Sequence, residues 1–304
     1  MRIKIAVPHN TVTGGIELLH QVAAELNKYD GVTADIWYMY DTNVTDIPDD
    51  YLVYGNSVNN VLHDDDILMF PEIWADYTNE PRYAKYKKIV YWESVDNYFP
   101  HTPKDRWYKF GKDTLHISQT EYSNRFLSDV VKTDEVIEIT DYVNDDYLDC
   151  DISGKRDQVV LYNPAKGMEF TDKVIELAAG VTFKPITGMA RKEILELMKK
   201  SMVWIDFGNF PGKDRLPREA GACGMCLITG KRGSAKYHKD MGIPDEYKID
   251  NANFADVQEV VDKIRDLLEH FDERQELYSA YRKRLKQERT QFRKGIKALV
   301  EKLS

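Results

Sequence analysis

The sequence predicts an α/β fold in which helices cover both faces of parallel sheets. Short apolar segments alternate with amphipathic ones along most of the 304 residues, as expected for strands followed by helices. The alternation starts again after a polar, acidic stretch near the middle of the chain, which indicates two α/β halves. Hydrophobic residues make up 42% and charged residues 31%, a composition typical of globular proteins and not of disordered ones.

The first half begins with a strand, a glycine-bearing loop and a helix. The strand is Ile3–Val7, and apolar residues at helical spacing follow the pair Gly14-Gly15. The remaining elements expected in this half are strands at Thr33–Tyr40, Ile67–Phe70, Lys88–Trp92, Leu115–Ser118 and Val136–Ile139, and a helix at about Glu121–Asp129.

The acidic segment Asp145–Asp157 is interpreted as a linker, and a second α/β half follows it. The elements expected there are strands at Val159–Asn163, Val181–Ile186, Val203–Phe207 and Met225–Thr229, and helices at Glu169–Ala179, Arg191–Lys200 and Leu216–Cys223. Long charged helical stretches close the chain. We therefore expect domains at residues 1–150 and 151–275, and a C-terminal basic helix at 276–304 that packs back on the first domain.

Charge is distributed unevenly along the chain, whose net charge is −9. From Ala280 to Ser304 nine Lys or Arg residues stand against two Glu residues. Such a helix either leans on the acidic body of its own chain or contacts phosphates of DNA or anionic lipid. No stretch approaches the ~20 apolar residues that cross a bilayer. The expected location is therefore cytoplasmic, with peripheral contact at the inner membrane face as an option.

The three cysteines do not indicate a disulfide framework or a zinc site. Cys223 and Cys226 have C-x-x-C spacing, but the chain has only one other cysteine, Cys150, and no second pair to complete a zinc site. The pair also spans a predicted turn from helix to strand, unlike the redox motif at a helix start. We expect buried structural cysteines and a reducing compartment.

Polar residues after predicted strands of the first half are candidates for acid–base catalysis. His9, Glu93 and Asp96 follow strand ends, and ligands of open α/β sheets bind beyond the carboxyl ends of strands. Each can equally be an ordinary loop residue. Gly14 and Gly15 suit close approach of an anionic ligand to a helix N-terminus, although a purely structural turn fits them as well.

The second half offers two candidate anion-binding loops. Asn163, Lys166 and Gly167 follow its first strand, where a lysine can neutralise a diphosphate and glycine lets the chain bend around it. After the strand that ends at Phe207 comes a charged cluster at a helix start. This cluster consists of Lys213, Asp214, Arg215, Arg218 and Glu219.

These motifs resemble the donor half of retaining GT-B glycosyltransferases. That family has a Lys-Gly turn after the first strand of its second domain, here Lys166-Gly167, and then a helix Glu-Ala-x-Ala-x-Gly, here Glu219–Gly224. The stretch from Gly212 to Ala220 is also similar to poorly characterised bacterial and phage proteins of this kind. The resemblance implies two Rossmann-like domains facing a central cleft. Glu219 would hold the ribose, Lys166 the diphosphate, and Gly14 and Gly15 would face the sugar and phosphates.

The function implied is transfer of a sugar, a hexose or pentose, from a nucleotide-diphosphate sugar to a hydroxyl group. Retention of configuration, no cofactor and no metal site are expected. The favoured acceptor is a surface polysaccharide or a lipid-linked sugar. One alternative is a phage-type enzyme that modifies a hydroxymethylated base of DNA. Another is a non-catalytic nucleotide-sugar-binding protein, because Pro211 stands where the family often has a first glutamate.

Overall fold

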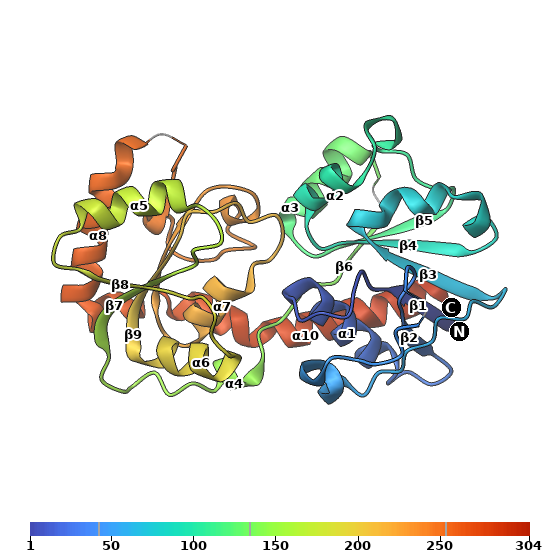
Figure 1. Cartoon of the computed structure of the whole chain (residues 1–304), viewed down its shortest axis with the longest axis horizontal. Coiled ribbons are helices and arrows are strands. Elements are labelled where there is room, and N and C mark those ends of the chain that lie inside the picture. The colour runs from blue at the N-terminus through green and yellow to red at the C-terminus, as the bar shows by residue number, and fades with distance from the viewer. Residues whose placement is uncertain (42, 134, 253) are drawn as a thin grey trace. The chain divides into compact units, whose positions relative to one another are not determined.

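The computed structural model describes residues 1–41, 43–133, 135–252 and 254–304. The chain forms two compact units (Figure 1), one of Met1–Asp141 with Thr290–Ser304 and the other of Tyr142–Arg289. Both units are α/β, as the sequence predicts. Among the described helices, none is long and apolar enough to cross a membrane.

The first unit is built on a parallel sheet whose strands lie in the order β2-β1-β3-β4-β5-β6. Their bounds are β1 Arg2–Ala6, β2 Thr33–Trp37, β3 Asp66–Pro71, β4 Lys87–Trp92, β5 Thr114–Ser118 and β6 Val136–Glu138. Strand β2 pairs with one edge of β1, and the next strand, β3, pairs with the opposite edge of β1. The loops that leave β1 and β3 therefore diverge, which opens the sheet edge at their carboxyl ends.

Helices α1 (Gly14–Leu26), α2 (Val95–His101) and α3 (Glu121–Phe126) follow strands of this sheet. Helix α1 begins where Thr13 caps it: the Thr13 side chain accepts a hydrogen bond of 3.3 Å from the backbone N–H of Ile16. Its apolar face, which includes Leu18, Leu19 and Val22, is fully buried. The N-terminus of α1 is thereby fixed at the carboxyl end of β1.

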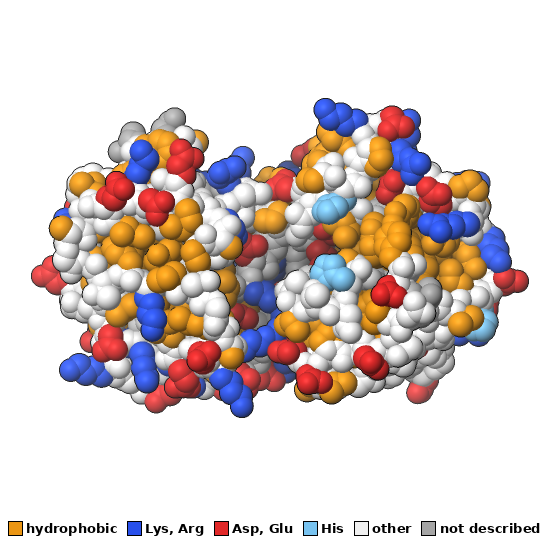
Figure 2. Space-filling view, viewed as in Figure 1, with side chains coloured by type: hydrophobic (Ala, Val, Ile, Leu, Met, Phe, Trp, Pro, Cys, Tyr) orange, Lys and Arg blue, Asp and Glu red, His pale blue; other side chains and the backbone are white. Residues whose placement is uncertain are grey.

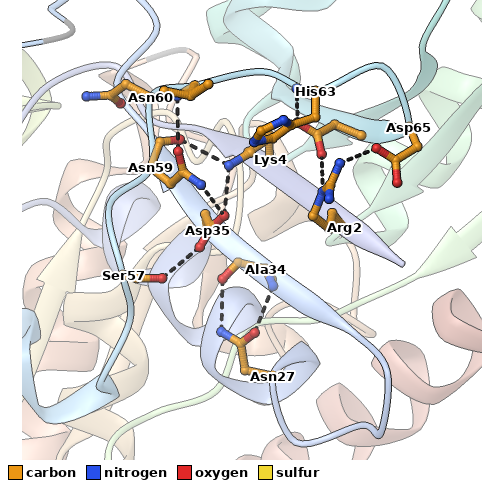
Figure 3. A network of polar contacts seen from close by, with 12 residues as sticks. Arg2, Lys4, Asn27, Ala34, Asp35, Ser57, Asn59, Asn60, His63 and Asp65 are labelled. Atoms are coloured by element: carbon orange, nitrogen blue, oxygen red, sulfur yellow. Dashed lines mark hydrogen bonds and ion pairs between the residues drawn. The ribbon is translucent and has the colours of Figure 1, made fainter.

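A buried polar network fastens the segment around residue 58 to the first two strands (Figure 3). The ammonium group of Lys4, on β1, lies 2.8 Å from a carboxylate oxygen of Asp35, on β2. Ser57 and Asn59 donate to the same carboxylate at 2.7 and 3.2 Å. Lys4 is fully buried, so its charge is compensated almost entirely by Asp35.

The second unit repeats the architecture with the strand order β11-β10-β9-β7-β8. Its strands are β7 Asp157–Tyr162, β8 Thr182–Pro185, β9 Ser201–Asp206, β10 Cys226–Gly230 and β11 Lys248–Ile249. Its helices are α4 Asp145–Leu148, α5 Met168–Leu177, α6 Arg191–Lys200, α7 Arg215–Ala222, α8 Val257–Glu269 and α9 Phe271–Glu276. Here β8 and β9 flank β7 on opposite sides, so the loops after β7 and β9 diverge.

Helix α10 (Ser279–Leu303) belongs to the second unit up to Arg289 and to the first from Thr290 onward. Several of its cations pair with acidic residues of the unit in which they lie. Arg289 is 2.5 Å from Asp145, and Arg293 is 3.4 Å from Glu25. Lys302 is 3.5 Å from Glu135.

Most predicted elements agree with the structure to within two residues at each end, and three show larger differences. The strand expected at Thr33–Tyr40 ends at Trp37, because the N–H of Tyr38 donates to the Asn60 side chain at 2.8 Å instead of continuing the ladder. The helix expected to reach Asp129 is α-helical to Phe126 and continues as a π-turn. The expected linker contains α4, whose first turn carries two aspartates, where negative charge suits the helix N-terminus.

Replacing Asp35 by Asn should destabilise the fold strongly, because it leaves the Lys4 charge buried without a compensating carboxylate. We expect the free energy of unfolding to fall by about 3–5 kcal/mol, measured by urea denaturation. Asp64→Asn is the control. It removes a partner of Lys85 in a pair whose side chains are 55% and 91% exposed, and it should leave stability almost unchanged, because solvent screens such pairs. Equal losses for the two variants would contradict the role of the buried pair.

Candidate functional site

A pocket of about 300 Å³ opens at the carboxyl ends of β1, β3 and β4 in the first unit, where the strand order reverses. This is the place at which open α/β sheets bind ligands. The residues lining it are Pro8, His9, Thr13, Gly15, Ile16, Leu19, Pro71, Glu72, Ile73, Glu93, Ser94 and Asn97. The pocket therefore combines an apolar wall from α1 with two carboxyl groups and an imidazole.

Gly15 is required by a close approach of Glu93 to the start of α1. A Cβ atom at residue 15 would lie 2.6 Å from a carboxylate oxygen of Glu93. No side chain larger than hydrogen fits there unless Glu93 moves. The N-terminus of a helix carries partial positive charge, so this placement favours a negatively charged Glu93.

The second carboxyl group, Glu72, follows β3 and is almost completely buried. Burial raises the pKa of Glu72 to about 7, although backbone N–H groups of Glu72, Glu93 and Ser94 act in the opposite direction. The N–H of Glu93 donates to a Glu72 oxygen at 3.1 Å. The pocket thus holds a carboxyl group that changes protonation near neutral pH, beside the carboxylate at the helix start.

The structure brings two of the three predicted acid–base candidates together. His9 and Glu93 line the same pocket, and Nδ1 of His9 lies 2.5 Å from the hydroxyl oxygen of Thr11. Asp96, in the first turn of α2, instead accepts a hydrogen bond of 2.7 Å from the Tyr122 hydroxyl. Glu72 was not among the residues predicted for the site. It follows an apolar strand just as Glu93 does, so the same spacing rule would have found it.

In the second unit, Lys166 lies between the loops that leave β7 and β9. Its ammonium group contacts the Asp214 carboxylate, donates to the Asn209 carbonyl at 3.0 Å and lies 3.7 Å from Asp206. Its side chain is 25% exposed. Burial lowers the pKa of Lys166 and raises that of Asp206, while each opposes the shift of the other. Asp206, the last residue of β9, is a second group that was not among the predicted site residues.

Two glycines allow these loops to touch at their starts, directly beyond the neighbouring strands β7 and β9, before the loops diverge. Gly167 has φ +69°, and a Cβ atom there would lie 2.4 Å from the backbone nitrogen of Gly208. A Cβ atom on Gly208 would in turn lie 2.4 Å from the Lys166 side chain. The backbone of Gly208 is held by its own hydrogen bond to Asp206, at 2.9 Å. The Lys166-Gly167 turn is therefore fixed against the end of β9.

The charged residues before and within α7 have partners in different places. Asp214 contacts Lys166, whereas Lys213 and Arg218 contact α10. Lys213 lies 2.7 Å from Glu288 of α10, and Arg218 lies 2.5 Å from the other oxygen of that carboxylate. All three side chains are less than a tenth exposed. In this structure Lys213 and Arg218 form a buried ion cluster with Glu288, and the diphosphate contact expected for them stays a prediction. Glu288 carries no recognisable sequence signal, because it is an isolated acid within a basic helix.

The remaining predicted donor residues follow strands β7 and β9 of the second unit, apart from Gly14 in the first unit. Asn163 turns the chain after β7 by accepting the N–H of Ala165 at 3.0 Å. Arg215 and Glu219 are half-buried on α7, and Asp214 immediately precedes that helix. Gly14 is the first residue of α1 in the other unit. The ligand contacts predicted for these residues stay predictions.

Comparison with models of known protein families and with curated protein sequences finds no match. Among solved structures, a glycosyltransferase from Rickettsia africae is similar with a TM-score of 0.70 at 15% identity, covering 100% of this chain and 98% of that one. A sucrose-phosphate synthase from Thermosynechococcus elongatus has a TM-score of 0.66 at 13% identity, covering 99% and 98%. HepE from Anabaena, in complex with UDP-glucose, has a TM-score of 0.66 at 12% identity, covering 99% and 100%. These likenesses confirm the predicted GT-B fold.

Titration of Glu72 should make stability depend on pH. The ordinary pKa of 4.5 applies in the unfolded chain and about 7 in the folded protein, so the folded state holds an extra proton between these values. Stability must then fall as pH rises through this window. We expect wild type to lose on the order of 2 kcal/mol more than Glu72→Gln between pH 5 and 7, measured by urea denaturation. Glu121→Gln is the control and should follow wild type. Parallel curves for wild type and Glu72→Gln would contradict the assignment.

Glu288→Gln should remove a buried carboxylate that pairs with both Lys213 and Arg218. We expect it to lower the free energy of unfolding by about 1–3 kcal/mol in chemical denaturation, the range for losing hydrogen bonds between charged groups. A matched change on the same helix is Glu301→Gln, which removes a partner of Lys297 in a pair that is about two-thirds exposed on both sides. It should change stability by less than about 0.5 kcal/mol. A small loss for Glu288→Gln would show that the cluster does not need its carboxylate.

Proposed function

We propose that this chain is a glycosyltransferase that moves a sugar from a nucleotide-diphosphate sugar to a hydroxyl acceptor. The observation that carries the proposal is the placement of reactive groups at both strand-order reversals. Lys166 occupies this position in the second unit, and a pair of carboxyl groups occupies it in the first. The likeness to HepE, which was solved with UDP-glucose, supports a nucleotide-sugar as the donor class.

In the donor half, the Lys166 ammonium would bind the diphosphate and Glu219 the ribose hydroxyls. The ammonium is already positioned by Asp206 and Asp214, and its side chain is partly open to solvent. On binding, a phosphate oxygen would replace the Asp214 carboxylate as the nearer partner. A fixed cation at this point stabilises the charge that develops on the departing diphosphate, and no bound metal is part of the proposal. Retention of anomeric configuration is proposed from the resemblance alone.

In the acceptor half, the pocket on the first unit would orient the acceptor hydroxyl. Glu93 and His9 are the candidates to accept its proton, because both line the pocket and each carries a basic side-chain atom. Among the described residues that line this pocket, none is Lys or Arg. Two carboxyl groups without a cation disfavour a phosphorylated acceptor. This supports an uncharged saccharide hydroxyl, on a surface polysaccharide or a lipid-linked sugar.

The basic helix supports the same choice over DNA. Arg289, Arg293 and Lys302 pair with acidic residues of their own units. On the face shown in Figure 2, Lys and Arg side chains lie among Asp and Glu side chains on both units. A DNA-binding protein would instead gather its Lys and Arg residues on one basic face. A saccharide acceptor needs no such face.

Donor binding is tested by a thermal-shift screen against UDP, GDP, CDP, ADP and their common sugar conjugates. One nucleotide family should stabilise wild type, by on the order of 3 kcal/mol at a hundredfold excess over its dissociation constant. Lys166→Ala and Glu219→Ala should abolish that shift. Lys199→Ala and Glu196→Ala are matched controls, because these residues form an exposed pair on α6, and both should respond like wild type.

The donor assignment is wrong if no nucleotide shifts the wild type, or if all four variants respond alike. Incubation with the bound nucleotide-sugar then separates an enzyme from a binding protein. Release of nucleoside diphosphate in the presence of oligosaccharides supports transfer, and binding without release supports the non-catalytic alternative. Strong loss of turnover on added salt with a DNA substrate would overturn the saccharide assignment.

A further inference from the structure

Two of the three cysteines touch, and they are not the two that share the C-x-x-C motif. The sulfur atoms of Cys150 and Cys223 lie 2.8 Å apart, although the residues are separated by 73 positions. This separation is roughly 0.8 Å longer than a disulfide bond of about 2.0 Å. We propose that Cys150 and Cys223 are a reversible oxidation site, at which a peroxide or a low-molecular-weight disulfide joins them in a disulfide bond.

The surrounding structure holds both sulfur atoms in place. Cys150 follows α4 and is partly exposed, with its sulfur 3.8 Å from the carbonyl oxygen of Asp146. Cys223 ends α7 and is fully buried, with its sulfur 3.9 Å from the carbonyl oxygen of Tyr147. Helices α4 and α7 pack directly on each other. An oxidant can therefore reach the sulfur of Cys150. The sulfur of Cys223 is buried and lies against that of Cys150.

The pKa values of the two thiols are shifted in opposite directions, and the more exposed thiol is the more acidic one, as an oxidation site of this kind requires. A hydrogen bond from Cys223 lowers the pKa of Cys150, and the nearby positive charges of Lys199 and Arg156 lower it further. The same hydrogen bond together with burial raises the pKa of Cys223. Arg156 is fixed by hydrogen bonds of 2.9 and 2.8 Å to the carbonyl groups of Met198 and Ser201. Cys150 is the attacking thiolate and Cys223 the resolving thiol.

With a peroxide, the Cys150 thiolate attacks one oxygen, the O–O bond breaks and hydroxide leaves, which converts Cys150 to a sulfenic acid. The Cys223 sulfur then loses its proton and attacks the Cys150 sulfur, so that the S–S bond forms and water leaves. In total, two thiols and one peroxide give one disulfide and two waters. With a small disulfide, two successive thiol–disulfide exchanges release two small thiols.

Cys226 provides an internal control. It lies in β10, beyond a turn at Gly224, which has φ +81°. Burial raises the pKa of Cys226 to about 12, so this thiol does not ionise at neutral pH. The structure thus assigns the disulfide to the distant pair and leaves the C-x-x-C motif reduced. This inference does not depend on the proposed function.

The test uses the full chain, oxidised with hydrogen peroxide or oxidised glutathione, alkylated and digested with trypsin. Cys150 lies in the tryptic peptide Thr133–Lys155, and Cys223 and Cys226 lie together in Glu219–Lys231. Mass spectrometry should find these two peptides linked, with one alkylated cysteine at residue 226, and dithiothreitol should separate them. Cys226→Ala should retain the link, and Cys150→Ser and Cys223→Ser should lose it.

Oxidation should also raise the melting temperature, by on the order of 5 °C, because the bond closes a long loop. Cys150→Ser, a change at a partly exposed position, should melt like reduced wild type and should not respond to oxidant. A bond between Cys223 and Cys226, over-oxidation of Cys150 without a link, or no reaction at all would each overturn the proposal.

Discussion

The order of the strands in the two parallel sheets is the constraint on which the rest of this structure depends. In each unit the first strand is flanked on opposite sides by the next two strands along the chain, so the loops that leave them must separate. A parallel sheet brings all its carboxyl ends to one edge, and this separation is the opening in that edge. Glu72 and Glu93 lie at the opening of one unit, and Lys166 lies at that of the other.

Charge at these openings is balanced by groups that are distant in the sequence. Lys166 lies between Asp206 and Asp214, from the end of a strand and the start of a helix. Glu288, on the C-terminal helix, compensates both Lys213 and Arg218. Buried ions that lose a partner are costly, so such groups hold their elements in a fixed relation within the unit. Helix α7 is therefore held against α10 by charge, and Gly221 of α7 lies close to the Tyr281 ring of α10.

The fold by itself does not establish a function, because one fold carries many activities. The proposal of sugar transfer depends on the character of the two sites: a positioned cation in one unit, and in the other a pocket with two carboxyl groups and, among its described lining residues, no Lys or Arg. Position in the fold likewise distinguishes the cysteine pair that touches from the pair that shares a sequence motif. Sequence spacing draws attention to Cys223 and Cys226, whereas contact and exposure select Cys150 and Cys223.

The sequence alone determined the α/β class, most strand positions and the loops that carry the candidate groups. It could do so because strand and helix periodicity and glycine placement are local properties, and because polar residues after an apolar strand reach the open edge of a parallel sheet. His9, Glu93, Lys166 and Gly167 were found in this way. Tertiary structure alone decided that Glu72 is buried beside Glu93, that Glu288 takes Lys213 and Arg218 as partners, and that Cys150 meets Cys223. Each of these depends on burial or on contacts between distant segments, and no local pattern encodes either.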